Sequence, residues 1–265
     1  MSFANQIVWI TGASSGIGEA LALELARAGA RLVLSARRTA ELERVAALTG
    51  LAPADVLVLP LDMTDEAALP GKVADVLTRF GRIDYLFQNA GITQRGLVAD
   101  TSFAVYRQLM ELNFFGVVAL TQAVLPRLLA QRAGHIVVTS SVAGKIGIKQ
   151  RSGYCASKHA LHGFFDALRA ETHDAGLRVT MVCPGYINTS ISLHALDAAG
   201  RPHGRLDTHQ AQGMPADQFA RRLLRAVAAR REEVYIGGRE VLGIYLKRFW
   251  PRLLSRLLRR RPAES

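Results

Sequence analysis

A tyrosine and a lysine stand four residues apart in Tyr154-Cys-Ala-Ser-Lys158. Residues i and i+4 share one face of a helix, so the phenol and the ammonium are expected to project side by side. A nearby ammonium favours tyrosinate and lowers the pKa of a phenol from its ordinary value of about 10. Since a phenol tuned in this way passes a proton to or from a substrate oxygen, the pair predicts general acid–base chemistry.

A serine pair ends the predicted strand His135–Ser140 and lies upstream of the tyrosine. Ser141 precedes Tyr154 by thirteen residues, which is enough chain for a loop to return to the same crevice. Ligands of open α/β sheets bind beyond the carboxyl ends of the strands. We therefore expect the Ser141 hydroxyl to hold a carbonyl oxygen beside the phenol.

The segment Thr11-Gly-Ala-Ser-Ser-Gly-Ile-Gly18 follows an apolar strand and opens a helix, which is the context of a dinucleotide-binding turn. Gly12 permits the tight turn, whereas Gly16 and Gly18 let the backbone approach a pyrophosphate and pack the helix on the sheet. Free amides at a helix start favour phosphate. The turn predicts dinucleotide contacts from Gly12, Ser14, Ser15, Gly16, Ile17 and Gly18.

The end of the second strand indicates which dinucleotide binds. NAD sites usually place an acid there for the ribose 2′-hydroxyl, but the run Leu34-Ser-Ala-Arg-Arg38 contains none. A guanidinium suits a 2′-phosphate through bidentate, charge-assisted hydrogen bonds. We therefore predict NADP(H) in preference to NAD(H), with Arg37 as the main contact and Arg38 beside it. A solvated arginine pair at a helix start is the alternative.

The elements that must position these residues alternate between strands and helices. Seven short apolar segments predict strands at Ile7–Thr11, Arg31–Ala36, Val56–Leu61, Ile83–Gln88, His135–Ser140, Arg178–Cys183 and Val234–Ile236. Six stretches with helical spacing lie at Gly18–Ala28, Thr39–Thr49, Lys72–Phe80, Phe103–Gln131, Tyr154–Ala175 and Ala216–Arg231. This pattern predicts an α/β fold: one doubly wound Rossmann domain over residues 1–240, with a seven-stranded parallel sheet and helices on both faces.

Composition excludes several other classes of protein. The 265 residues are 49% hydrophobic and 21% charged, which disfavours a disordered chain. Two cysteines cannot form a disulfide framework, so a reducing compartment is expected. Because the N-terminus lacks a secretory pattern and no uninterrupted apolar run reaches about 18 residues, we predict a cytoplasmic protein, with peripheral membrane attachment as the alternative.

Two segments depart from the α/β pattern. Residues 190–214 contain glycine and proline without clear periodicity and predict a substrate lid, or else a mobile surface insertion. The tail, 241–265, carries seven basic residues and no acid between 247 and 261, in a chain of net charge +11. Leu253, Leu254, Leu257 and Leu258 form an apolar stripe, so the tail predicts a basic amphipathic helix. It would bind an anionic membrane surface or pack its leucines on the domain or a partner subunit; no nucleic-acid-binding module accompanies the charge.

Together the motifs resemble those of the short-chain dehydrogenase/reductases, over roughly Ile7 to Ile236. Thr11–Gly18 looks like the glycine motif of that family, and Asn89-Ala90-Gly91 like its strand-four motif, although Gln88 stands where a second Asn is common. Asp62, followed by Met63, matches the adenine-contacting acid. The order and spacing of Asn113, Ser141, Tyr154 and Lys158 match the catalytic tetrad, and Pro184, Gly185, Ile187 and Thr189 fall in a segment similar to the nicotinamide-side loop.

The resemblance implies hydride transfer between a nicotinamide and a carbonyl or alcohol carbon. It makes Tyr154 the general acid/base, and gives Lys158 the roles of lowering the tyrosine pKa and binding the nicotinamide ribose. Ser141 would orient the substrate oxygen, and Asn113 would hold a water that connects Lys158 to solvent. The resemblance also implies a homodimer or homotetramer. A similarity to the branch related to 11β-hydroxysteroid dehydrogenases suggests a lipophilic substrate.

The remaining candidate residues have plainer interpretations. His159 and His162 are expected at the surface, and Cys155 as a buried structural thiol. No His/Cys/acid set has metal-ligand spacing, so no metal site is predicted. A cofactor-binding sensor or membrane-surface scaffold on the same fold is the alternative to an enzyme, and the intact set of four catalytic residues argues against it.

Overall fold

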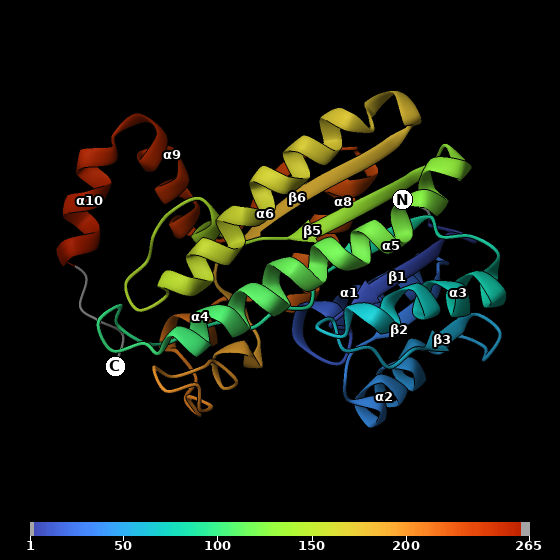
Figure 1. The fold of residues 1–265 in the computed structure, drawn as a ribbon, viewed down its shortest axis with the longest axis horizontal. Helices are drawn as coiled ribbons and strands as arrows, with labels where there is room; N and C mark the ends of the chain where they lie inside the picture. The colour runs from blue at the N-terminus through green and yellow to red at the C-terminus, as the bar shows by residue number, and fades with distance from the viewer. Residues whose placement is uncertain (1–2, 261–265) are drawn as a thin grey trace.

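The computed structural model describes residues 3–260 and contains the expected parallel sheet (Figure 1). The strand order is β3-β2-β1-β4-β5-β6-β9, and all neighbouring strands are parallel. The bounds are β1 Ile7–Thr11, β2 Arg31–Ser35, β3 Val56–Val58, β4 Tyr85–Gln88, β5 Gly134–Thr139, β6 Leu177–Pro184 and β9 Glu233–Ile236. The strand order reverses between β1 and β4, where open α/β sheets bind their ligands. The predicted doubly wound fold is confirmed.

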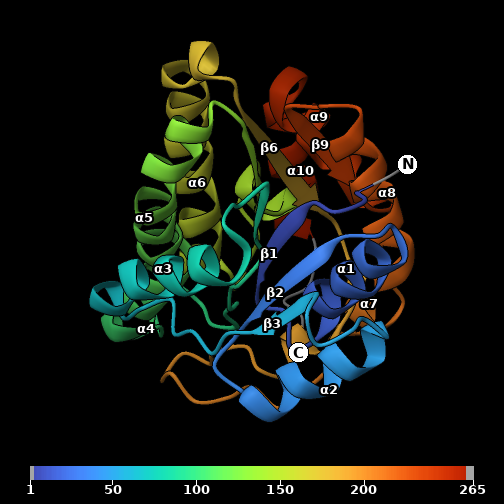
Figure 2. The same ribbon diagram turned by 90° about the vertical axis from the view of Figure 1, so that its right-hand side faces the viewer.

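Helices cover both faces of the sheet (Figure 2). One face carries α1 (Gly16–Arg27), α2 (Thr39–Thr49) and α8 (Ala216–Ala228); the other carries α3 (Leu69–Phe80), α5 (Gly116–Gln131) and α6 (Ser152–Glu171). Side chains alternate along a strand, so Val8 and Ile10 enter one core while Ile7 and Trp9 enter the other. Burial on both faces explains why the strands are continuously apolar.

The element boundaries differ from the predicted ones for local reasons. Strand β3 ends at Val58 rather than Leu61, although the Leu59 and Leu61 amides still donate to the carbonyls of Leu34 and Ala36 at 2.9 and 3.0 Å. Helix α3 begins at Leu69 rather than Lys72, with a proline in its first turn. Helix α2 ends as predicted, because Gly50 adopts a left-handed conformation with φ of 68°.

The predicted helix Phe103–Gln131 consists of α4 (Phe103–Met110), a π-helical turn (Glu111–Phe115) and α5. Within residues 3–260, it is the one helix long and apolar enough to cross a membrane, with a mean hydropathy of 1.5 and 39% of the apolar window buried. Its inner side supplies Val117, Leu120 and Val124 to a core, which accounts for part of that composition. The π-helical turn carries Asn113, and such turns often occur at functional sites.

The segment 190–214 contains short regular elements. A two-stranded sheet joins β7 (Ile187–Asn188) to β8 (Met214–Pro215), and α7 spans Thr208–Ala211. Backbone hydrogen bonds tie the segment to the loop after β4: the Arg95 amide donates to the Leu196 carbonyl at 2.7 Å, and the Leu196 amide donates to the Thr93 carbonyl at 2.9 Å. The segment therefore folds back over the carboxyl edge of the sheet.

The C-terminal residues form two helices, α9 (Leu242–Phe249) and α10 (Pro251–Arg260), seen in red in Figure 1. The predicted leucine stripe is divided between two environments. Leu254 is buried and Leu258 partly buried against Ile146, whereas Leu253 and Leu257 are each 45% exposed. The last arginine of the basic run, Arg261, lies outside the described residues.

Candidate active site

A cavity of about 700 Å³ opens at the carboxyl ends of the central strands. The predicted site residues that line it are Gly12, Ser14, Ser15, Ile17, Arg37, Arg38, Met63, Asn89, Ala90, Gly91, Ser141, Tyr154, Lys158, Pro184, Gly185, Ile187 and Thr189. Gly16, Gly18, Asp62 and Asn113 are not part of the lining. Segments far apart in the sequence therefore meet at one crevice.

The glycine-rich turn closely approaches its neighbours. Gly12 has φ of 67°, and a Cβ on Gly18 would lie 2.1 Å from the Gly12 carbonyl oxygen. The Asn89 side chain donates to the carbonyls of Thr11 and Gly12 at 3.3 and 3.4 Å. The turn is thus held against the end of β4, and Ser15 and Ile17 at the start of α1 line the cavity. This arrangement fits a dinucleotide pyrophosphate, because side chains larger than hydrogen would fill the turn.

The end of the cavity next to β2 is basic. Arg37 and Arg38 are exposed and line the cavity, and the Arg38 guanidinium donates to the Ser14 hydroxyl at 3.3 Å. Asp62 accepts hydrogen bonds from the Thr64 amide and hydroxyl at 2.9 and 2.8 Å. The Thr64 amide, then its hydroxyl and the nearby charge of Arg37, lower the pKa of Asp62. The carboxylate is therefore held ionised beside the two arginines.

Three of the four predicted catalytic residues converge on the cavity. The Ser141 hydroxyl lies close enough to the Tyr154 phenol to oppose the rise in the pKa of that phenol. Ser141 also accepts from the Ala143 amide at 3.1 Å, which fixes its side chain at the end of β5. Lys158 donates to the Thr139 carbonyl at 2.8 Å, with its ammonium 5.9 Å from the centre of the Tyr154 ring. The expected helix-face juxtaposition of Tyr154 and Lys158 is present.

The pKa of Tyr154 does not fall as the neighbouring ammonium had predicted. Burial raises the pKa of Tyr154 and outweighs the opposing effects of the Ser141 hydrogen bond and the Arg151 and Arg95 charges. Burial also lowers the pKa of Lys158 to about 8, because the buried ammonium loses its hydration. The net direction of the Tyr154 pKa is thus opposite to the predicted one, because burial outweighs the groups that favour tyrosinate.

Asn113 lies behind the cavity wall and is fully buried. Its side-chain amide accepts from the Ile92 amide and donates to the Ile92 carbonyl, both at 2.9 Å, and donates to Ser157 at 3.0 Å. A Cβ on Gly91 would lie 3.1 Å from the Asn113 oxygen and 3.4 Å from the Lys158 nitrogen. Asn113 therefore fixes the loop after β4 next to Lys158.

Gln88, which departs from the family pattern, forms hydrogen bonds through its side chain with residues of α5. Its side-chain nitrogen donates to the Val117 carbonyl at 3.1 Å and to the Thr121 hydroxyl at 3.0 Å. It joins the end of β4 to α5 and does not line the cavity. The departure thus changes the packing behind the site.

An ion-pair cluster beside the tyrosine was not predicted. Arg95 and Arg151 line the cavity, and both pair with Asp207 from the 190–214 segment. All three side chains are at least nine-tenths buried. Arg151 stands about one helical turn before Tyr154, so the sequence could have indicated a cation near the phenol. Nothing in the sequence indicates that Asp207 is its partner.

The opposite end of the cavity is apolar. Its walls include Ile146, Leu246, Leu254 and Leu258, so α9 and α10 help to enclose it. The segment 190–214 also contributes Leu196, whereas Leu206 of that segment is 45% exposed.

The two histidines differ in environment. His159 is exposed as predicted, but His162 is 7% exposed and its Nε2 lies 2.9 Å from the Ser140 hydroxyl. The prediction for His162 is wrong because its side of α6 faces the sheet. Cys155 is buried, as predicted.

Comparisons with known proteins agree with this geometry. The family model described as short chain dehydrogenase matches residues 6–198. The Drosophila melanogaster protein "Dehydrogenase/reductase SDR family protein 7-like" is 41% identical over 270 residues, covering 98% of this chain and 82% of the relative. A short-chain dehydrogenase/reductase from Burkholderia phymatum, solved with NAD, matches with a TM-score of 0.84 at 26% identity, covering 96% of each chain. A Thermococcus sibiricus alcohol dehydrogenase complexed with 5-hydroxy-NADP matches with a TM-score of 0.75 at 27% identity, covering 89% of this chain and 97% of that one.

Proposed function

The chain belongs to the short-chain dehydrogenase family, and from this premise we propose an NADP(H)-dependent oxidoreductase that acts on a lipophilic carbonyl or secondary alcohol. The observation that carries the proposal is the meeting of Ser141, Tyr154 and Lys158 on one cavity that also contains the glycine-rich turn. A sensor would need the turn but not the hydroxyl pair beside it. The bound cofactor would supply or accept the hydride.

The chain's own residues supply the proton and orient the substrate. In the reductive direction, Tyr154 donates its phenolic proton to the substrate oxygen, and Ser141 hydrogen-bonds that oxygen as negative charge develops. The Lys158 ammonium stabilises the resulting tyrosinate. Asn113 holds the loop after β4 in register with Lys158.

NADP(H) preference rests on Arg37 and Arg38. Neither Ser35 nor Ala36, at the end of β2, offers a carboxylate to a ribose 2′-hydroxyl. The two guanidiniums supply donors for a 2′-phosphate, and the Arg38–Ser14 hydrogen bond directs one of them towards the glycine-rich turn. Glycine-turn residues and Asp62 would hold the rest of the adenosine and pyrophosphate, with Pro184, Gly185, Ile187 and Thr189 on the nicotinamide side.

A lipophilic substrate follows from the wall that α9 and α10 give to the cavity. We propose residues 1–240 as the catalytic domain, 190–214 as its lid and 241–265 as an accessory tail. The tail therefore contributes to the substrate pocket through Leu246, Leu254 and Leu258, as well as carrying charge.

The test follows NADPH absorbance with ketones and aldehydes graded from small and polar to large and apolar. The rate of NADPH consumption should increase with the size of the apolar part of the substrate. It should be lost in Tyr154→Phe, which removes the proton donor and keeps the ring. Tyr106→Phe, whose hydroxyl lies 3.0 Å from Ser152 outside the cavity lining, is the matched control. Turnover by Tyr154→Phe at the wild-type rate would refute the mechanism.

We also propose that the tail attaches a cytoplasmic protein to anionic membranes. Phe249 and Trp250 are 65% and 61% exposed and adjoin Lys247, Arg248 and Arg252. Exposed aromatics among basic residues suit a lipid interface. Phe249→Ser with Trp250→Ser should reduce sedimentation with anionic vesicles, while Phe103→Ser, on exposed α4, should not. Equal sedimentation of wild type, the Phe249/Trp250 double variant and Phe103→Ser would mean that the tail packs on the protein and does not bind the membrane through these aromatic residues.

Self-association through α4, α5 and α6 is the corresponding proposal for a partner subunit. Phe103 and Phe115 are 71% and 44% exposed along this layer. A homodimer or homotetramer would cover them, and sedimentation equilibrium measures the mass directly.

A further inference from the structure

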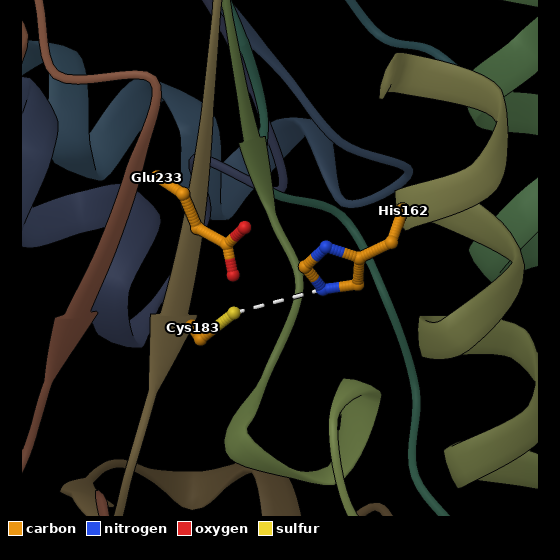
Figure 3. A group of neighbouring side chains, drawn as sticks. All are labelled: His162, Cys183 and Glu233. Atoms are coloured by element: carbon orange, nitrogen blue, oxygen red, sulfur yellow. Dashed lines mark hydrogen bonds between the residues drawn. The ribbon is translucent and has the colours of Figure 1, made fainter. Parts of the chain in front are cut away.

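Three potential metal ligands meet behind the active site, each from a different element (Figure 3). His162 comes from α6, Cys183 from β6 and Glu233 from β9. One imidazole nitrogen, the thiol sulfur and a carboxylate oxygen all lie within 4.8 Å of one another. Local spacing does not indicate this cluster, because His162 and Cys183 are 21 positions apart and Cys183 and Glu233 are 50 positions apart.

The histidine has an unsatisfied atom. His162 is 7% exposed, and its Nε2 lies 2.9 Å from the Ser140 hydroxyl and 3.6 Å from the Cys183 sulfur. Its Nδ1 is buried and has no hydrogen-bond partner among residues 3–260.

Solvent can reach the cluster from one side. The Glu233 side chain is 27% exposed, and its carboxylate lies 2.7 Å from the ammonium of Lys145, which is 24% exposed. A Cβ on Gly144 would lie 2.3 Å from the Ser140 hydroxyl oxygen and 3.2 Å from His162 Nε2, so the backbone of Gly144 packs closely against the histidine. A metal ion can thus enter beside Glu233, where it competes with the Lys145 ammonium for the carboxylate.

We propose that His162, Cys183 and Glu233 form a binding site for a divalent metal ion of the zinc type. Nitrogen, thiolate and carboxylate donors are the set that Zn²⁺ prefers, and three protein ligands leave a fourth position for water. Coordination replaces the S–H bond with a metal–thiolate bond and releases one proton to solvent. The Lys145 ammonium is displaced from Glu233 as the metal enters.

Metal binding also reaches the catalytic residues. Ser140 bonds both His162 and the Lys158 carbonyl, the latter at 3.2 Å, and is followed directly by Ser141. A metal that takes His162 Nε2 removes the Ser140–His162 hydrogen bond. The site would then lower turnover, a consequence that depends on the proposed function, whereas binding itself does not.

The test adds Co²⁺ to the metal-free full chain and records the thiolate-to-cobalt charge-transfer absorption. Wild type and Cys155→Ser should show the band at one metal per chain with release of one proton; Cys183→Ser should lose it. Cys155 is the matched control, because it is the other buried thiol and lies outside the cluster. Zn²⁺ should displace Co²⁺ and abolish the band.

Two variants at the partly exposed residues Glu233 and Lys145 test metal binding even if Cys183→Ser fails to fold. Glu233→Gln should weaken Co²⁺ binding, and Lys145→Met should strengthen it, because one removes a ligand charge and the other a competing cation. Circular dichroism and NADPH binding check that each variant is folded. No band in wild type and Lys145→Met, an unchanged band in folded Cys183→Ser, or equal affinity in the Glu233 and Lys145 variants would overturn the proposal.

Discussion

Replacing Arg37 or Arg38 with methionine should separate the two nicotinamide cofactors. Methionine keeps an unbranched apolar stem and removes the guanidinium, so NADPH loses its partner for the 2′-phosphate. NADH has a hydroxyl in that place and should be nearly unaffected. Arg107→Met, on exposed α4, is the control because its guanidinium lies over the Phe103 ring, 5.4 Å from the centroid, and outside the cavity.

The magnitude follows from the exposure of the two side chains. Hydrogen bonds to a charged group contribute about 1.5–3 kcal/mol, and the lower end applies because Arg37 and Arg38 are exposed and therefore screened. Since about 1.4 kcal/mol corresponds to a factor of ten, each single variant should raise the Kd of NADPH about tenfold. The double variant should raise it about a hundredfold if the two contacts add.

Titration of cofactor fluorescence at two salt concentrations measures these affinities. Wild type should lose NADPH affinity with salt more steeply than NADH affinity, and the double variant should lose that difference. Equal weakening of NADPH and NADH would mean that the arginines support the fold of the turn and do not read the phosphate. No change in either affinity would leave them as solvated charges.

Three further outcomes are expected. Gly18→Ala should abolish cofactor binding, because its Cβ would lie 2.1 Å from a carbonyl oxygen of the turn. The control Gly163→Ala places its Cβ in open space on α6, so it should raise the free energy of unfolding in urea by up to about 1 kcal/mol. Asp207→Asn leaves two buried guanidiniums without their shared carboxylate, so stability should fall by about 3 kcal/mol and limited proteolysis should cut the 190–214 segment faster; an unchanged cleavage rate would contradict the pairing. Burial, then nearby arginines, lowers the pKa of His135 to about 4, so its contribution to stability is complete above pH 6.5 and is lost as the pH falls towards 4; about 2 kcal/mol should be gone at pH 5, and His135→Asn should flatten the urea-unfolding profile over that range.

The sequence by itself determined the architecture and most of the proposed site. Continuous apolar strands alternating with helical spacing are compatible with a doubly covered parallel sheet and with few other folds. The glycine-rich turn, Ser141 and the Tyr154–Lys158 pair were identifiable because each depends on local spacing. Their shared crevice follows from topology, since parallel strands bring their carboxyl ends to one edge.

Only the tertiary structure decided the electrostatics and the long-range partners. The raised pKa of Tyr154 depends on how much of the phenol is buried, which no spacing encodes. Asp207 pairs with Arg95, which is 112 positions away in the sequence. Glu233 lies near Cys183 because β9 pairs with β6, where Glu233 is opposite Met181. The split leucine stripe of α10 has the same cause: periodicity predicts an apolar face, but which of its leucines becomes buried depends on the surface that the rest of the chain presents.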